Sequence, residues 1–395
     1  MSAPRRRRPQ PDVALSPELT DLSIERLRER RSAKWTYYDP DVLPSFVAEM
    51  DFPLAPPVKE ALHRAIDVDD TRYANPAATS IAANLAGFAQ RRMGWALDPD
   101  QVITCNDVVA GLADLLRVLT APGDPVIVTP PVYHPFFSLI PEAGREVLEV
   151  PLAGGRELDL DAISAAFTGG ARAMILCNPH NPTGTVCRPD ELEALADLAA
   201  EHEAWILSDE IHAPLTLPGA AHVPFVGLSE NAAARGVSLV SASKTFNLAG
   251  LGCAQIVTAA EPARSAVDAL PFSARHCGHI GAIATEAAYA EGEAWLDAVI
   301  EVLDHNRDLL GRLLEEHLPE AVYVAPAAGY LTWIDLSAYD LGSDPAGRLL
   351  ERGRVAISGG PMFGSGGEGF IRLNAGTSPG LMTEAVERIA GVANG

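Results

Sequence analysis

The sequence predicts an α/β protein, in which a mostly parallel sheet is covered by helices and a smaller α+β domain follows it. Short apolar segments alternate with helical patterns from about residue 100 to residue 260, as in a parallel sheet with helices on both faces. After residue 282 a long helical region runs to about residue 318, and shorter strand patterns follow it. A chain of 395 residues also suits two domains that share a cleft.

The N-terminal part is predicted in two pieces. Residues 1–22, with four arginines between prolines, predict a disordered tail. On a strongly acidic chain these arginines favour a solvated tail over a phosphate or membrane site. Residues 23–55 predict a segment associated with the smaller domain, beginning with a short helix near Ile24 and continuing as an extended, proline-bounded stretch over 34–53. If Glu49 and Asp51 are buried there, they need partners; otherwise the stretch is an exposed loop.

We expect residues 56–285 to form the large domain and residues 286–395 the small one. In the large domain the patterns predict helices at 57–66, 79–93, 108–120 and 189–203, and strands at 101–104, 126–129, 173–176, 205–208 and 237–240. In the small domain they predict strands at 322–324, 330–335, 355–357 and 369–374. The glycine-rich stretch 359–369 predicts a flexible loop and not a phosphate cradle, because no helix signal follows it.

Composition excludes several classes of protein. The formal charge is −22, from 52 acidic and 30 basic residues, which argues against general nucleic-acid binding. No apolar run approaches the ~20 residues needed to span a bilayer, and no apolar stretch follows the N-terminal arginines as in a secretory signal. The five cysteines are odd in number and form no C-x-x-C pair, so we expect reduced thiols in a cytoplasmic protein and no metal site.

The strongest chemical signal is Lys244, which follows Ser241 and Ser243 directly after an apolar strand over 237–240. A lysine partly removed from water loses affinity for its proton and becomes a nucleophilic amine. Such an amine suits Schiff-base formation with a carbonyl, above all with pyridoxal phosphate (PLP), and the two serine hydroxyls could bind a phosphate. Taken alone, this stretch is also compatible with a solvated lysine after a strand.

Other predicted strand ends carry polar or aromatic residues. Tyr133 stands between prolines and could stack on a planar ring or pack on the surface. The loop 177–184 contains two Asn-Pro steps, which can project asparagine amides into a cleft. Asp209 closes an apolar strand and needs a partner, for which a protonated pyridine nitrogen fits. Asp107 precedes a predicted helix that begins at 108. The N–H groups of that turn could bind an anion, but on local grounds Asp107 is more simply a helix cap.

Three of these segments, 178–184, 208–212 and 241–244, resemble in order and spacing the class I/II aminotransferase-fold PLP enzymes, which have fold type I. The segments 34–35, 47–52, 209–212, 244–251 and 372–376 are similar to one branch, the C–S β-lyases of the MalY/PatB type. The resemblance covers nearly all of residues 30–390. It therefore implies a PLP-dependent transferase-like fold across most of the chain.

The resemblance also implies roles around the cofactor ring. Lys244 would form the Schiff base with PLP and move protons. Asp209 would pair with the pyridine nitrogen and keep it protonated. Asn181 would hydrogen-bond the ring hydroxyl, Tyr133 would stack on the ring, and His212 would complete the cofactor site.

The remaining implied roles concern the phosphate and the subunit arrangement. Backbone N–H groups of Val108 and Val109, with the hydroxyls of Ser241 and Ser243, would bind the phosphate. Tyr73 matches the tyrosine that reaches the phosphate of the neighbouring subunit, which implies a homodimer.

Arg372 matches the arginine that binds the α-carboxylate of an amino-acid substrate, for which its planar fork is suited. As an ordinary strand residue it would instead form a surface ion pair of little energetic weight. The implied reaction is cleavage of cystathionine or another cysteine S-conjugate to a thiol, pyruvate and ammonia. An aminotransferase of the same fold and a lyase with an added regulatory role are the alternatives.

The chain departs from the family pattern at several positions. Common aminotransferases have a tyrosine at the position of His212 and a phosphate-binding arginine at the position of Gly252, and both departures match the lyase branch. Asp107 stands where the branch usually has glycine, and Phe46 replaces a tryptophan. Tyr73 lacks flanking glycines. These last differences bear on substrate choice and not on the cofactor.

Overall fold

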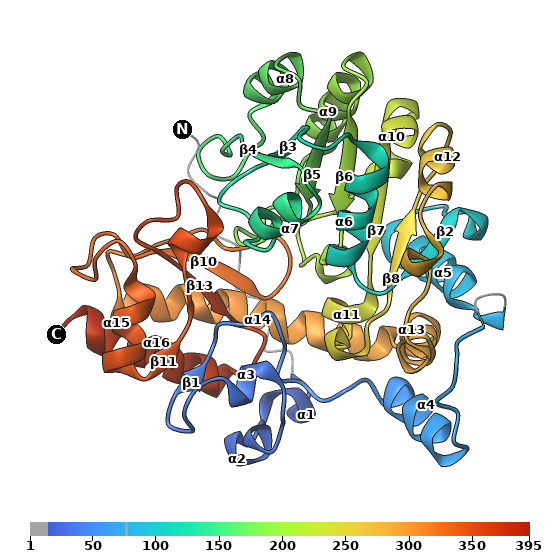
Figure 1. Ribbon diagram of the computed structural model, residues 1–395. Coiled ribbons are helices and arrows are strands. Elements are labelled where there is room, and N and C mark those ends of the chain that lie inside the picture. Colours follow the sequence, from blue (N-terminus) through green and yellow to red (C-terminus); the bar gives the residue numbers. More distant parts are fainter. Residues whose placement is uncertain (1–14, 76–77) are drawn as a thin grey trace.

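The large domain of the computed structural model, which describes residues 15–75 and 78–395, is built on a seven-stranded sheet (Figure 1). The strand β8 runs antiparallel to both of its neighbours, β2 and β7, while the other pairs are parallel, so the predicted mostly parallel sheet is confirmed. Across the sheet the strands are β2 (Val102–Cys105), β8 (Ala254–Val257), β7 (Gly236–Val240), β6 (Trp205–Asp209), β5 (Ala173–Cys177), β3 (Pro125–Val128) and β4 (Glu146–Glu149).

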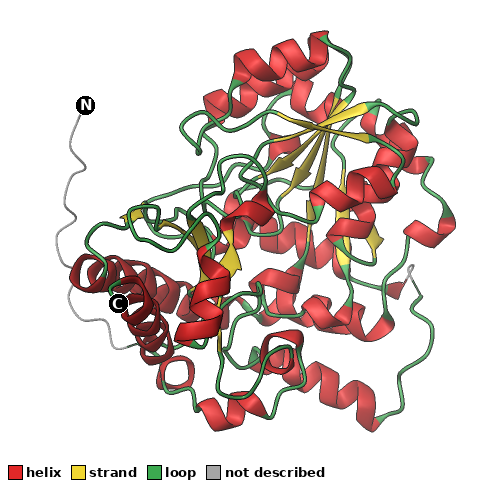
Figure 2. Cartoon of the chain, turned by 60° about the vertical axis from the view of Figure 1, so that its left-hand side comes forward, coloured by secondary structure: helices red, strands yellow, loops and turns green. Residues whose placement is uncertain are grey.

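Helices cover both faces of this sheet because successive strand side chains point to opposite sides. In β5, Ile175 belongs to one hydrophobic core, whereas Met174 and Leu176 belong to the other. The first core includes residues of α6 (Val108–Leu119), α7 (Phe136–Glu142) and α12 (Ala263–Asp268). The second includes residues of α5 (Ile81–Met93), α8 (Leu160–Thr168), α9 (Pro189–Glu201), α10 (Glu230–Arg235) and α13 (His279–Glu291). Figure 2 shows the strands fanning out between these helices.

The small domain contains an antiparallel sheet with helices packed against it. Its strands, in spatial order, are β12 (Ser358–Gly359), β13 (Phe370–Asn374), β10 (Leu331–Asp335) and β9 (Val322–Tyr323). Its core also includes residues of α14 (Glu293–His317), α15 (Pro345–Gly353) and α16 (Pro379–Ala393). In Figure 1 the 25-residue helix α14 runs from beneath the large domain into the small one. The glycine-rich stretch predicted as a loop contains β12 and the 3-10 turn η7 (Gly360–Phe363).

Short elements complete the chain. A parallel pair of strands, β1 (Leu43–Pro44) and β11 (Val355–Ala356), joins the N-terminal segment to the small domain. Further helices are α4 (Pro56–Asp67), α11 (Ala242–Thr245), η2 (Pro99–Gln101), η3 (Ala213–Leu215), η4 (Phe225–Gly227), η5 (Ala249–Leu251) and η6 (Phe272–Ala274). Within the part of the chain that the structure describes, no helix is both long and apolar enough to cross a membrane. The domain boundaries drawn from the sequence stay predictions.

Two expectations for the N-terminal part are wrong. Of the predicted tail 1–22, residues 1–14 lie outside the described residues, but 17–20 form α1 (Pro17–Thr20), with Leu19 buried in the core and α1 in contact with α14. The stretch predicted as extended begins with a helical turn, α3 (Ala33–Thr36), after α2 (Ile24–Arg28). In that turn Lys34 and Trp35 both reach Asp51, a long-range contact that the local apolar pattern does not reveal.

A buried ion pair fixes the chain just before the large domain. Lys34 Nζ lies 2.8 Å from Asp51 Oδ2, with the two side chains only 1% and 3% exposed. Trp35 Nε1 donates to the other carboxylate oxygen at 3.0 Å, and Lys34 also donates to the Glu49 carbonyl at 3.1 Å. The expectation that a buried carboxylate here needs a partner is therefore confirmed for Asp51.

Two asparagines tie the 46–51 segment to both domains. Asn374, at the end of β13, donates to the carbonyls of Val47 and Glu49 at 2.7 Å each. Asn247, just after α11, accepts from Met50 N at 3.1 Å and donates to Met50 O at 2.8 Å. Asn247 has a φ of 61°, a left-handed conformation that asparagine tolerates better than most residues. The segment is thus held from the small domain and from the large domain at once.

Lys34→Met should lower the free energy of unfolding by about 3–5 kcal/mol, because it leaves the buried Asp51 carboxylate without its cation. Urea unfolding monitored by circular dichroism measures this loss. Arg64→Met, which breaks an exposed ion pair with Glu60, is the control and should cost less than about 1 kcal/mol. Equal, small losses in the two variants would show that the Lys34–Asp51 pair does not stabilise the fold.

Candidate active site

Most of the residues selected from the sequence gather at one cavity of about 130 Å³. It lies where the carboxyl ends of β5, β6 and β7 meet, the edge at which open α/β sheets place their ligands. Its lining includes Val108, Val109, Tyr133, Asn181, Asp209, His212, Ser241, Ser243 and Lys244. Arg372 reaches the same site from the small domain through Asn181.

Lys244 lies in α11, directly after β7, and its side chain is half-buried. Ser241 caps this helix, since its Oγ accepts from Ser243 N at 3.0 Å and donates to the Cys253 carbonyl at 2.7 Å. Lys244 Nζ donates to the Ala48 carbonyl at 3.0 Å. Burial, and next the positive charge of Arg372, lower the pKa of Lys244. The amine is therefore held by a neutral dipole in a site that favours its uncharged, nucleophilic form.

Asp209 closes β6 and is buried beside the cavity. Burial raises its pKa to about 7, while a hydrogen bond from Ile211 N and the charge of Lys244 act in the opposite direction. Among the described residues the carboxylate accepts one hydrogen bond, from Ile211 N at 3.2 Å. A buried carboxylate with so few donors is stabilised by a cationic partner.

The neighbouring Glu210 has a different environment. It accepts from Ser238 Oγ at 2.7 Å and Phe225 N at 2.9 Å, and its second oxygen lies 3.2 Å from His222 Nε2. Its oxygens are thus occupied by the protein itself. Of the two adjacent acids, only Asp209 lines the cavity.

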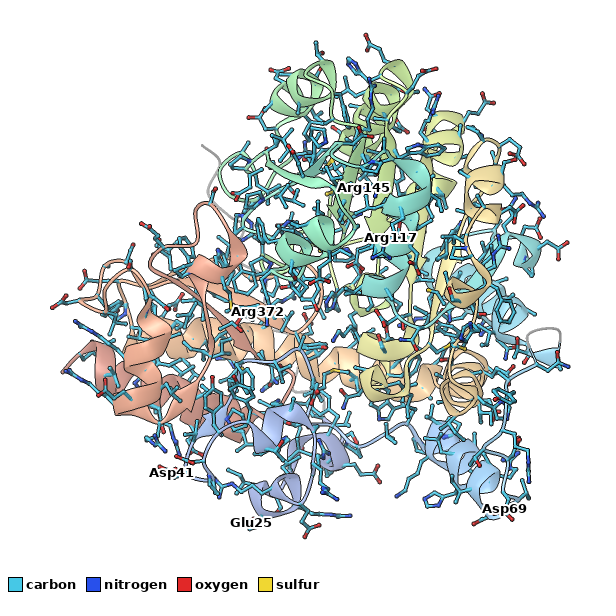
Figure 3. The ribbon with its side chains drawn as sticks, in the orientation of Figure 1. Glu25, Asp41, Asp69, Arg117, Arg145 and Arg372 are labelled. Carbon is cyan, nitrogen blue, oxygen red and sulfur yellow. The ribbon has the colours of Figure 1, made fainter. Side chains whose placement is uncertain are left out.

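Arg372, on β13, is buried where the small domain faces the large one (Figure 3). Its guanidinium donates to Asn181 Oδ1 and to the Phe46 carbonyl, both at 2.9 Å, and to Ser358 Oγ at 3.2 Å. Its Nε is buried without a partner, and within the described residues no carboxylate lies at ion-pair distance. Burial lowers its pKa to about 10, so it stays cationic at neutral pH. The alternative of a surface ion pair is therefore wrong, and the site suits an incoming carboxylate.

The N-terminus of α6 opens onto the cavity beside Ser243. Asp107 caps this helix, because its Oδ1 accepts from Ala110 N at 2.8 Å. The prediction of a helix cap at this position is therefore confirmed. Its φ of −156° is extended backbone, so the aspartate at this position needs no left-handed turn. Val108 and Val109 occupy the first turn, where amide groups lack intrahelical acceptors and favour an anion.

His212 and Tyr133 both line the cavity. Burial, followed by the charges of Lys244 and Arg372, lowers the pKa of His212 to about 3, so its imidazole is neutral. Its Nδ1 is buried and has no hydrogen-bond partner among the residues that the structure describes. Tyr133 is half-buried, and burial raises the pKa of its hydroxyl, which keeps the ring uncharged.

Tyr73 does not reach this cavity on its own chain. It lies between α4 and α5 and is fully exposed, with 101% relative accessibility. Its implied role therefore requires a second subunit.

The structure adds residues that the sequence patterns did not indicate. Tyr330 is buried, and its hydroxyl donates to the Ala48 carbonyl at 3.0 Å, the same oxygen that Lys244 uses. Ser358 Oγ supports Arg372 and donates to Phe46 O. The sequence marked Tyr330 as part of a strand, but nothing in it indicated which face of that strand meets the cavity.

The sequence is similar to those of known proteins. Residues 47–389 match the family described as aminotransferase class I and II. The chain is 40% identical to the cystathionine beta-lyase of Corynebacterium glutamicum, with 93% of this chain and 98% of that protein covered. It is 35% identical to the cystathionine beta-lyase PatB of Bacillus subtilis, with 93% and 99% covered.

The fold also matches a solved structure that contains PLP. Cystalysin from Treponema denticola, whose crystal structure contains the pyridoxal 5'-phosphate cofactor, superposes with a TM-score of 0.86 at 29% identity. The match covers 95% of this chain and 98% of that one. On the family match and these relatives together, the chain belongs to the aminotransferase class I and II family.

Proposed function

We propose that the protein is a PLP-dependent carbon–sulfur lyase, which cleaves cystathionine or another cysteine S-conjugate to a thiol, pyruvate and ammonia. The observation that carries the proposal is that a half-buried amine, Lys244, and a buried guanidinium, Arg372, serve one site, and that among the described residues neither is bound to a carboxylate. The first can act on an α-carbon and the second can bind an α-carboxylate. Relatives matched over more than 90% of the chain are named for this reaction.

The donor set of the cavity fits PLP. Asp209 offers a buried carboxylate for the pyridine nitrogen, and the first turn of α6 with Ser243 suits the phosphate. Asn181 uses its Oδ1 for Arg372, which leaves its amide nitrogen as the donor for the ring hydroxyl. Tyr133 borders the cavity as an uncharged ring that can stack. Bound there through Lys244, PLP supplies an electron sink for the α-carbon of an amino acid.

The protein's own groups then position the substrate and move its proton. Arg372 binds the α-carboxylate through its planar fork. Because this fixes the α-carbon, its hydrogen can face Lys244 Nζ, which accepts the proton. The Ala48 carbonyl holds the resulting ammonium, as it holds Nζ in the structure. The same ammonium can return a proton to the departing thiolate.

Two features favour a lyase over a transaminase. Gly252 borders the cavity where common aminotransferases, by the resemblance, have an arginine. It has a φ of 57°, and a Cβ here would lie 3.0 Å from Asn106 Oδ1, so a side chain would be strained. His212 replaces the aminotransferase tyrosine and is neutral. The aminotransferase reading remains the second candidate, because the family includes such enzymes and Lys244 and Arg372 would serve either reaction.

The quaternary structure and location are part of the same proposal. A homodimer is supported by Tyr73, which is fully exposed on its own chain and would reach the phosphate in the partner's site. A cytoplasmic location is supported by the five cysteines, all of which are free thiols in the structure.

Lys244→Ala should abolish covalent retention of PLP after borohydride reduction and lower turnover by a factor on the order of 10²–10⁴ or more, because the positioned amine is lost. Mass spectrometry of the denatured protein detects the retained cofactor. Lys59→Ala, at an exposed lysine of α4, is the control and should keep it. Covalent PLP in Lys244→Ala would remove this lysine from the mechanism.

With cystathionine alone, the enzyme should release pyruvate without any added keto acid, which lactate dehydrogenase measures continuously. Arg372→Ala should raise KM by roughly 10²-fold, because a buried charge-assisted contact to the carboxylate is lost, with Arg372→Lys intermediate. Arg117→Ala, at a half-exposed arginine, is the control. Efficient exchange between an amino acid and a keto acid, without pyruvate from any thiol conjugate, would establish the transaminase instead.

Co-expression of Lys244→Ala with Tyr73→Ala should restore about a quarter of the wild-type activity, because half of randomly paired dimers are mixed and each has one intact site. Each variant alone should be nearly inactive. Tagging the two chains differently allows the mixed dimers to be purified and assayed. Mixed dimers as inactive as the single variants would contradict the exchange of Tyr73 between subunits.

A further inference from the structure

Three of the five cysteines gather on one side of the cavity. Cys105, at the end of β2, pairs in register with Ala254 of β8, and Cys253 immediately precedes that residue. Cys253 also lines the cavity. Cys277, which follows Cys253 by 24 residues, belongs to the same small apolar cluster as Cys253. None of these thiols has a part in the proposed reaction.

The backbone holds Cys253 and Cys277 side by side. Gly278 N donates to the Gly252 carbonyl at 3.3 Å, so the residues next to the two cysteines are hydrogen-bonded. The first turn of α13 packs tightly on the same segment, since a Cβ at Gly281 would lie 2.3 Å from the Leu251 carbonyl oxygen. Because neither segment can withdraw without breaking this packing, the two cysteines stay beside the same apolar cluster on adjacent backbone segments.

The two thiols differ in exposure and acidity. Cys277 is partly exposed, whereas Cys253 is buried. A hydrogen bond from the Cys253 thiol lowers the pKa of Cys277, against the opposing effects of burial and of the Glu286 carboxylate. The same interaction raises the pKa of Cys253, together with burial and the neighbouring Cys105. A reachable, more acidic thiol beside a protected one is the arrangement of an attacking and a resolving cysteine.

We propose that Cys277 and Cys253 form an oxidant-sensitive pair, which a peroxide converts to a disulfide beside the cavity. The Cys277 thiolate attacks one peroxide oxygen and displaces hydroxide, which leaves a sulfenic acid at Cys277. The Cys253 thiol then attacks that sulfur and releases water. In sum, two thiols lose two electrons and two protons, and hydrogen peroxide is reduced to two waters.

The disulfide would form at the wall of the cavity, because Cys253 lines it. The Cys253 carbonyl accepts from Ser241 Oγ, and Ser241 caps the helix that carries Lys244. Cys177 and Cys187 offer no counterpart of Cys277, because both are buried and burial raises the pKa of each thiol. The pair would be oxidised in the same way whichever substrate the enzyme cleaves.

Peptide mapping of the peroxide-treated holoenzyme tests the pair. Trypsin cleaves after Arg264 and Arg275, so Cys253 and Cys277 fall into separate peptides, 245–264 and 276–307. We expect these two peptides to be joined with the loss of two hydrogens, in proportion to peroxide added, and to separate again with dithiothreitol. Unreacted thiols at both positions, or a preferred link from either cysteine to Cys105, would overturn the proposal.

Matched variants separate the two roles. Cys253→Ser keeps a hydroxyl donor but cannot close the disulfide, so dimedone should trap a sulfenic acid at Cys277. Cys253→Ala also removes the donor, and alkylation of Cys277 by iodoacetamide should then shift to higher pH than in Cys253→Ser. Cys187→Ser is the control and should leave the linked peptides unchanged. Identical pH profiles for the two Cys253 variants, or no dimedone adduct, would contradict the assignment.

Discussion

The cavity depends on two backbone carbonyls in the 46–51 segment. Lys244 donates to Ala48 O and Arg372 to Phe46 O, so both basic side chains of the site are held by neutral dipoles. A carboxylate in either place would stabilise the charged lysine and occupy the guanidinium permanently. With carbonyls instead, burial lowers the pKa of Lys244 and leaves Arg372 able to bind an acid from outside the protein.

These carbonyls can accept from Lys244 and Arg372 only if the 46–51 segment stays in place. Buried polar contacts hold it there. The Lys34–Asp51 pair anchors the C-terminal end of the segment, while Asn374 and Asn247 bind its backbone from the small and the large domain. Each of these groups would be costly to bury without its partner. The position of the Lys244 amine is therefore set by contacts that extend well outside the cavity, which links the stability of the N-terminal segment to the geometry of the site.

Adjacent residues at the end of β6 show how strand geometry divides structural from functional acids. Successive side chains of a strand point in opposite directions. Glu210 faces Ser238 and His222 and is satisfied by them, whereas Asp209 faces the cavity with a single backbone donor. The same strand end therefore supplies one carboxylate that holds the protein together and one that can meet a cationic group of a ligand.

The alternation of apolar and helical patterns was sufficient to predict the mostly parallel sheet, and the strand-end residues Lys244 and Asp209 followed from it, because parallel strands end at a common edge. Local pattern could not reveal that residues 33–36 are helical or that Leu19 is buried, since both depend on contacts with distant segments. Only the tertiary structure brought Tyr330 and the Ala48 carbonyl together across 282 residues. A backbone carbonyl is chemically the same at every position, so its role is decided by where the folded chain places it.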